Sequence, residues 1–153
     1  MTLTGAYRVP APRERVFATL TDPAVLQRLI VGCESLVKRD DGVYVARLKV
    51  GLGSIKGTYT GEVRMTNVNQ PESYTLIVDG RGSGGFAKGT ANIRLTAVET
   101  ETDVDCSADV TVGGAIAAVG SRLVEVAARR MMDSFFGALL VEVSQQDRPG
   151  DPS

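Results

Sequence analysis

The feature that most constrains the fold is a long series of segments with alternating apolar and polar residues, running from Cys33 to Gly113. From Ile55 to Thr66, apolar residues or glycines occupy every second position, and charged residues or threonines occupy the others. A period of two is typical of strands with one buried face, and the turn residues between the segments fit hairpins. The pattern therefore predicts consecutive antiparallel strands that form a meander with one solvated face.

Helical spacing replaces this period on both sides of the series. After a first strand over Thr2 to Val9, two short apolar-periodic segments follow, and Thr21-Asp22-Pro23 separates them as a helix cap. Residues 114–145 carry apolar residues three and four apart, which predicts one helix of about 45 Å. The order predicts an α+β fold in which two short helices follow the first strand. A curved antiparallel sheet of about six or seven strands then wraps round a long C-terminal helix.

An apolar cavity is expected between this sheet and this helix, because Gly57 and Gly61 fall at inward-facing strand positions. Glycines there permit sharp curvature and withhold side chains from the interior. Strand alternation and helix periodicity place the predicted ligand-binding residues around the cavity, with Phe86 in a loop that closes over it. These residues are Tyr59, Val63, Leu76, Val78, Phe86, Ile93, Leu95, Val119, Leu123, Val126, Met131 and Phe135.

A second apolar group falls outside the face of the helix that is expected to meet the sheet. Its members are Met132, Phe136, Leu139 and Leu140. A helix presents one face to a sheet, so these side chains are expected to be partly exposed. Such a patch would suit a protein partner or a membrane surface.

Histidine is absent from the 153 residues, which excludes Ser-His-Asp and Cys-His nucleophile systems and zinc sites that need histidine. Cys33 and Cys106 fit no metal-ligand spacing, and reduced, structural thiols are favoured over a disulfide. The formal net charge of −1 gives no field to attract nucleic acid. We predict a single domain over residues 1–146, followed by a disordered tail or the start of a linker over residues 147–153.

Two motifs with catalytic or cofactor-binding associations lie in the wrong structural context. Residues 80–85 match G-x-G-x-x-G, but a strand follows where a dinucleotide site requires a helix, so a flexible glycine-rich hairpin at the cavity rim is favoured. Residues 35–38 match S-x-x-K, but they fall in a predicted strand rather than at a helix start. Alternation also places the strand carboxylates on the solvated face: Glu62, Asp79, Asp103, Asp105 and Asp109. An interior without acid, base or metal ligand favours binding of an apolar molecule over catalysis, so no catalytic or metal-ligating residue is predicted.

Several short segments occur in an order that resembles the CoxG-like family of carbon monoxide dehydrogenase subunits, within the START-like helix-grip superfamily. The resemblance covers about residues 3–140 and rests on the following segments, of which the third and fourth are the most specific: Ala11-Pro12 with Asp22-Pro23, Gly32-Cys33-Glu34, Gly82 to Gly89, Val112 to Arg122, and Phe135-Phe136. The chain departs from the family pattern at Val31, where proline is usual, and at Phe17, where tryptophan is frequent.

The resemblance implies a non-catalytic accessory protein of aerobic carbon monoxide oxidation that links a molybdenum-containing hydroxylase to the cytoplasmic membrane. Electrons that leave such an enzyme must reach a lipid-soluble carrier, so a menaquinone, a ubiquinone or another lipid is the expected ligand. The protein is expected in the cytoplasm, peripherally at the inner face of the cytoplasmic membrane. Two alternatives stay open: an enzyme like the polyketide cyclases and aromatases of the same superfamily, and a protein-interaction module with a filled core.

The end of the chain bears on the expected membrane contact. Many relatives continue through a variable linker into a hydrophobic C-terminal anchor, whereas this sequence stops at Pro152-Ser153 in linker-like sequence. It is therefore expected to be either a soluble variant or a shortened chain whose full-length form carries an apolar anchor after Pro152.

Overall fold

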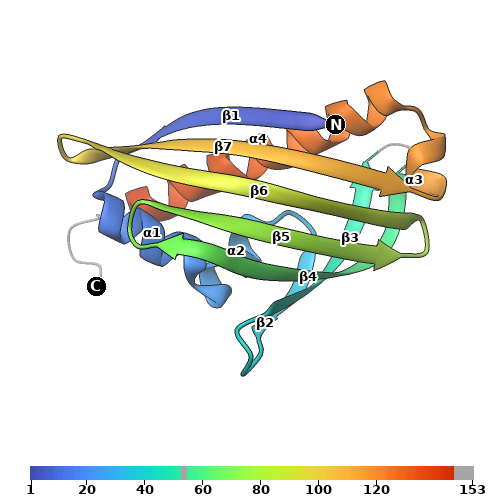
Figure 1. The fold of residues 1–153 in the computed structure, drawn as a ribbon, viewed down its shortest axis with the longest axis horizontal. Helices are drawn as coiled ribbons and strands as arrows, with labels where there is room; N and C mark the ends of the chain where they lie inside the picture. Colours follow the sequence, from blue (N-terminus) through green and yellow to red (C-terminus); the bar gives the residue numbers. More distant parts are fainter. Residues whose placement is uncertain (53–54, 147–153) are drawn as a thin grey trace.

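The computed structural model describes residues 1–52 and 55–146 and contains one curved, seven-stranded antiparallel sheet (Figure 1). The long C-terminal helix passes behind β1 and β7 in the view of Figure 1, and the two short N-terminal helices lie at one end of the sheet. This arrangement confirms the predicted α+β fold of a curved sheet wrapped round a C-terminal helix. The predicted tail, residues 147–153, lies outside the described residues.

The strands form a meander whose order in the sheet is β1-β7-β6-β5-β4-β3-β2. Their bounds are β1 Thr2–Val9, β2 Cys33–Lys38, β3 Tyr44–Leu52, β4 Ile55–Asn69, β5 Ser73–Gly82, β6 Gly85–Val98 and β7 Glu101–Gly113. Every strand from β2 to β6 pairs with the next one in the chain, and β1 pairs with β7. Strands β1 and β2 are therefore the two edges of the sheet, and the C-terminal helix lies along β1.

Two short helices, α1 (Arg13–Thr21) and α2 (Pro23–Leu29), follow β1 as predicted. The Asp22 carboxylate caps α2 by accepting a hydrogen bond from the Ala24 backbone N–H at 3.0 Å. The Tyr44 hydroxyl of β3 donates to the Thr21 carbonyl at 2.7 Å, which attaches the end of α1 to the sheet. The predicted cap at residues 21–23 is thus confirmed.

The predicted single helix over residues 114–145 is wrong at its start, because the structure has two helices there. A short helix, α3 (Ala115–Ala118), precedes α4 (Ser121–Gln146). Gly120 lies between them with φ of +100°, a left-handed conformation that glycine adopts readily and that ends a helix. Its N–H donates to Ala117 O and its carbonyl accepts from Val124 N–H, so one residue ends α3 and begins α4. The 26 residues of α4 span about 39 Å.

The break at Gly120 changes which face of α4 meets the sheet. The buried residues of α4 are Val124, Phe136, Leu139 and Val143, which follow helical spacing from Val124 onward. Phe136 and Leu139 were expected on the partly exposed side, but only 4% and 0% of their surface is accessible. Conversely, Leu123, Val126 and Met131 were expected to face the sheet, but they are 43%, 45% and 38% exposed. The prediction assumed that one helical periodicity continues from α3 into α4, whereas Gly120 interrupts it.

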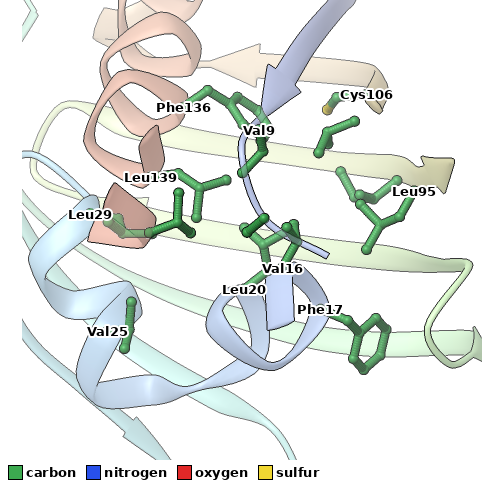
Figure 2. Close-up of a cluster of buried hydrophobic side chains, with 14 of the residues drawn as sticks. Val9, Val16, Phe17, Leu20, Val25, Leu29, Leu95, Cys106, Phe136 and Leu139 are labelled. Carbon is green, nitrogen blue, oxygen red and sulfur yellow. The ribbon is translucent and has the colours of Figure 1, made fainter. Parts of the chain in front are cut away.

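The largest buried cluster lies where α1, α2 and the second half of α4 meet the sheet (Figure 2). Leu29, Leu95 and Leu139 are among its most deeply buried side chains, and they come from α2, β6 and α4. Phe17 of α1 meets the ring of Tyr74 edge to face, with centroids 5.5 Å apart. This cluster fixes one end of α4 against the sheet.

Candidate functional site

The inward face of the sheet carries bulky side chains at its two ends and small ones in the middle. Across β4 to β7, two adjacent cross-strand rows hold only glycine, alanine and valine: Gly61, Gly80, Ala87 and Val112 in one, and Val63, Val78, Gly89 and Val110 in the other. Beyond β4, the first row continues through Ala46 to Leu36, and the second continues to Tyr44. Small side chains reach a short distance from the sheet, so the middle of the concave face recedes from the helix between two apolar clusters.

The middle of the concave face has open space beside Gly61. Gly61 is buried, and a Cβ atom built on it would have no atom within 4 Å. Its neighbours Val63 and Val78 point inward by strand alternation, yet they are only half-buried. Closely packed interiors rarely leave a buried position such as that of Gly61 without a neighbouring atom. We call this region, between the rows of small residues and α4, the central hollow.

The helix contributes small residues opposite the central hollow. Between Val124 and Phe136, the inward row of α4 continues through Ala127 and Ala128, both half-buried, to Met132. Alanine reaches only one carbon from the backbone, so α4 leaves space where the sheet also carries small side chains. The central hollow is therefore bounded by small residues on both sides.

Tyr59 of β4 forms one end of the central hollow. Its side chain is 8% exposed and clusters with Ile116 of α3 and Val124 of α4. The ring leans over the β5–β6 hairpin, where a Cβ on Gly82 would lie 2.6 Å from Tyr59 Cδ1 and a Cβ on Gly84 would overlap the Tyr59 hydroxyl. The glycines of this hairpin thus leave the space that the tyrosine ring occupies.

Backbone contacts attach the glycine-rich hairpin to the start of α3. The Ile116 N–H donates to the Gly84 carbonyl at 2.8 Å. A Cβ on Gly114 would lie 2.8 Å from Gly85 Cα, and a Cβ on Gly85 would overlap the Gly113 carbonyl oxygen. Close approach of two backbones explains these glycines, as it does at other packed glycine contacts. A strand follows residues 80–85 and pairs with β5, so the dinucleotide interpretation of this motif has no structural support.

The sequence profile of the carbon monoxide dehydrogenase subunit CoxG matches residues 5–144, which is most of the chain. The chain belongs to the CoxG family. No curated protein matches the sequence.

Solved structures share the fold of this CoxG-family chain over nearly its whole length. A conserved protein from Geobacillus kaustophilus superposes with a TM-score of 0.91 at 29% identity, covering 95% of this chain and 96% of that one. A START superfamily protein from Mycobacterium smegmatis gives 0.70 at 15% identity, covering 95% and 98%. The Zhui aromatase/cyclase from Streptomyces sp. R1128 gives 0.74 at 14% identity, covering 100% and 99%. The last two show the START-like fold alone.

The structure gathers the predicted strand residues on the concave face of this CoxG-family chain. Tyr59, Val63 and Val78 lie around the central hollow, with Leu76 in the next cross-strand row. Ile93 and Leu95 belong to the buried cluster at the α1 end, where both are less than 10% exposed. Binding of a ligand by these residues stays a prediction.

Phe86 does not close over the cavity as expected. It lies on β6, next to the inward-facing Ala87, so its side chain points to the convex face and is 37% exposed. The ring covers Gly113, and Lys88 Nζ lies 5.6 Å from its centroid in a cation–π arrangement. Strand alternation counted from Ala91 backwards would have placed Phe86 outward, whereas the glycine cluster suggested a loop.

Among the predicted helix residues, only two retain contact with the buried clusters. Val119 ends α3 and packs beside Tyr59, and Phe135 packs beside the cluster at the α1 end. Leu123, Val126 and Met131 are exposed and pack against none of the buried clusters. The residues that the sequence interpretation missed are Val124, Ala127, Ala128 and Phe136, and Gly120 is the signal that could have found them.

Titratable chemistry is sparse on the inward face. Burial raises the pKa of the Tyr44 and Tyr74 hydroxyls, so both stay protonated at neutral pH. Burial also raises the pKa of the free thiols Cys33 and Cys106, which makes them poor nucleophiles. Within residues 1–52 and 55–146, no group of three or more His, Cys, Asp or Glu residues lies close enough to hold a metal ion. In the same ranges, no helix is both long and apolar enough to cross a membrane.

Proposed function

We propose that this chain is a non-catalytic carrier that binds a respiratory quinone, a menaquinone or ubiquinone, or another lipid in the central hollow. The observation that carries the proposal is the open space beside the buried Gly61, bounded by small apolar residues of β4 to β7 and α4. Apolar enclosure of this kind favours a ligand that buries hydrocarbon.

The side chains around the central hollow support a carrier rather than an enzyme. Across β4 to β7, the inward positions that flank Gly61 hold glycine, alanine, valine and leucine, apart from Tyr59. General acid–base catalysis needs a group that exchanges a proton near neutral pH. The chain has no histidine, and its strand carboxylates alternate away from this face.

Membership of the CoxG family supports the physiological part of the proposal. The family is named as a subunit of carbon monoxide dehydrogenase, so the proposed partner is a molybdenum hydroxylase of that type. Electrons released by such an enzyme in the cytoplasm must reach a carrier dissolved in the cytoplasmic membrane. A protein that holds an apolar electron acceptor at the inner face of this membrane would link the two.

Filling the central hollow tests the proposal directly. In the Gly61→Leu variant, the new side chain enters open space, so we expect unchanged or higher thermal stability and at least about tenfold weaker binding of decylubiquinone or menaquinone-4. Gly137→Leu is the matched control, because Gly137 lies on α4 with equally open surroundings but is exposed. A loss of about 1–3 kcal/mol in Gly61→Leu would reveal a filled core. Binding that survives Gly61→Leu would place the ligand elsewhere.

Native mass spectrometry of gently purified protein separates the carrier from its alternatives. A co-purified quinone or lipid is the expected result. Protein that is empty but captures a molybdenum hydroxylase would instead indicate an interaction module. Turnover of an aromatic polyketide substrate would indicate an enzyme of the cyclase type.

A further inference from the structure

The two long sides of α4 meet the sheet differently, and the side along β1 is closed. Arg129 Nη1 donates to the Thr4 carbonyl at 2.5 Å, and the Tyr7 hydroxyl donates to Asp133 Oδ1 at 2.9 Å. The rings of Tyr7 and Phe136 stack at 4.1 Å between centroids. Hydrogen bonds and stacked rings thus join β1 to α4 along two turns of the helix.

The opposite side of α4 is open. A groove of about 320 Å³ lies between β3 and α4, and Val50, Gly51, Arg130 and Met131 are among its lining residues. A Cβ on Gly51 would have no atom within 4 Å, so this lining position is open. We call it the β3–α4 groove.

The rim of the β3–α4 groove is fixed by backbone contacts. Lys49 N–H donates to the Gly32 carbonyl at 2.9 Å, and a Cβ on Gly32 would overlap Lys49 O. Val31, which also lines the groove, is therefore held in place although 68% of its surface is exposed. Met131 on the facing side is 38% exposed. A pre-formed groove with exposed apolar walls is suited to an apolar ligand.

The β3–α4 groove adjoins the central hollow through Val50. This residue lines the groove and also packs beside Tyr59 and Val124, which form one end of the hollow. An extended hydrocarbon chain in the hollow would therefore reach the protein surface at this groove, where any polar group that it carries would meet water.

The charged residues of the β3–α4 groove determine which polar group fits. Lys49 and Arg130 are lining residues, and both side chains carry only hydrogen-bond donors. The one carboxylate among the lining residues, Asp133, already accepts the Tyr7 hydroxyl. We infer that the β3–α4 groove holds the head group of an amphiphilic ligand whose head presents acceptor oxygens and whose tail lies in the central hollow. This inference rests on the proposed function, because it assumes that the hollow is occupied.

Head-group selection can be tested with amphiphiles of equal chain length by titration calorimetry. Dodecanoate should bind the protein at least about tenfold more tightly than dodecylamine, and the Lys49→Met, Arg130→Met double variant should lose that preference, because charge-assisted hydrogen bonds are removed. The control is Lys88→Met, Arg94→Met, which removes the same charge from the convex face. Decylubiquinone, whose head group is neutral, shows whether a negative charge is needed. If the groove variant weakens the binding of decylubiquinone and dodecanoate equally, the groove accepts any head group with acceptor oxygens. If it weakens dodecanoate alone, the groove selects an anionic head group.

Blocking the groove gives an independent measurement. A Cβ on Gly51 would meet no atom within 4 Å, so Gly51→Trp should be accommodated at the groove and should weaken dodecanoate binding, whereas Gly137→Trp on the exposed side of α4 should not. Equal binding of both amphiphiles that is unaffected by Lys49→Met, Arg130→Met and by Gly51→Trp would overturn this inference and leave the proposed function standing. Failure of every amphiphile and of decylubiquinone to bind the unmodified protein would instead overturn the proposed function.

Discussion

The ring of Tyr7 on β1 stacks on the ring of Phe136 on α4, with centroids 4.1 Å apart and ring planes inclined by 14°. The ring of Phe135 meets Phe136 edge to face at 5.1 Å. The stack of Tyr7 on Phe136 attaches the first strand to the last helix and closes one side of the fold. It also fixes the rotation of α4 about its axis, because Phe136 can reach Tyr7 only when its face of the helix is turned toward the sheet.

The effect of two substitutions on stability tests which face of α4 is buried. Phe136→Ala should lower the free energy of unfolding by about 3–5 kcal/mol, because it removes a buried ring and leaves a cavity. Met131→Ala should cost less than about 1 kcal/mol, since its side chain is already exposed in the groove wall. Urea denaturation of both variants makes the comparison. A larger cost for Met131→Ala would show that the other face of α4 is buried.

The Tyr7 hydroxyl should make stability fall at alkaline pH. Burial, together with its hydrogen bond and charge interaction with Asp133, raises the pKa of Tyr7 to about 12, against an ordinary value of 10.0. The folded state therefore keeps this proton after the unfolded chain loses it, so the contribution is complete below pH 10.0 and is lost as the pH rises to about 12. Unfolding free energies of the unmodified protein and of Tyr7→Phe should converge over that interval. Parallel curves would contradict the prediction.

The sheet could be predicted from the sequence because its determinants are local. Alternation over β4 and β7, with turn residues between strands, sets which side chains face inward, and the Tyr59 and Val63 positions follow directly. The Asp22 cap is equally local, since a capping carboxylate bonds to the N–H two residues later. Antiparallel pairing of consecutive strands then leaves little freedom in the topology.

The phase of α4 and the position of Phe86 could not be obtained in the same way. A helix that is apolar over much of its circumference, with Met131-Met132 and Phe135-Phe136 side by side, allows more than one buried face. Gly120 determines which face is buried, because its left-handed φ ends α3 and a new helix begins after it. The periodicity of apolar residues does not reveal this backbone conformation. The β3–α4 groove depends on contacts between segments far apart in the chain, which no local pattern contains.

A buried hydroxyl between β7 and the end of β1 should contribute to stability by its hydrogen bond. Thr102 is fully buried, and its Oγ1 donates to the Ala11 carbonyl at 2.8 Å. Thr102→Val keeps the shape but leaves this carbonyl without its donor, so we expect a loss of about 1–2 kcal/mol in urea denaturation. Thr96→Val, at an exposed position of β6, should change stability by less than about 0.5 kcal/mol. Equal changes in stability for Thr102→Val and Thr96→Val would show that the hydrogen bond of Thr102 does not contribute to stability.

The break between α3 and α4 makes the same substitution act in opposite directions at two glycines. A Cβ on Gly120 or on Gly137 would have no atom within 4 Å, so steric overlap is not a factor at either position. Gly120 has φ of +100°, which alanine adopts at a cost of about 1–2 kcal/mol, so Gly120→Ala should destabilise the protein. Gly137 lies within α4, where alanine is favoured over glycine by about 0.5–1 kcal/mol, so Gly137→Ala should stabilise it.

Thermal and urea unfolding of the two variants, beside the unmodified protein, test this difference in sign. Circular dichroism adds a second measurement, because Gly120→Ala should not increase the helix content if the break persists. Stabilisation by Gly120→Ala with a gain of helix would mean that α3 and α4 can join into one helix. The face predicted from continuous periodicity, with Leu123 and Val126 toward the sheet, would then be accessible to the protein, and the central hollow would be lined differently.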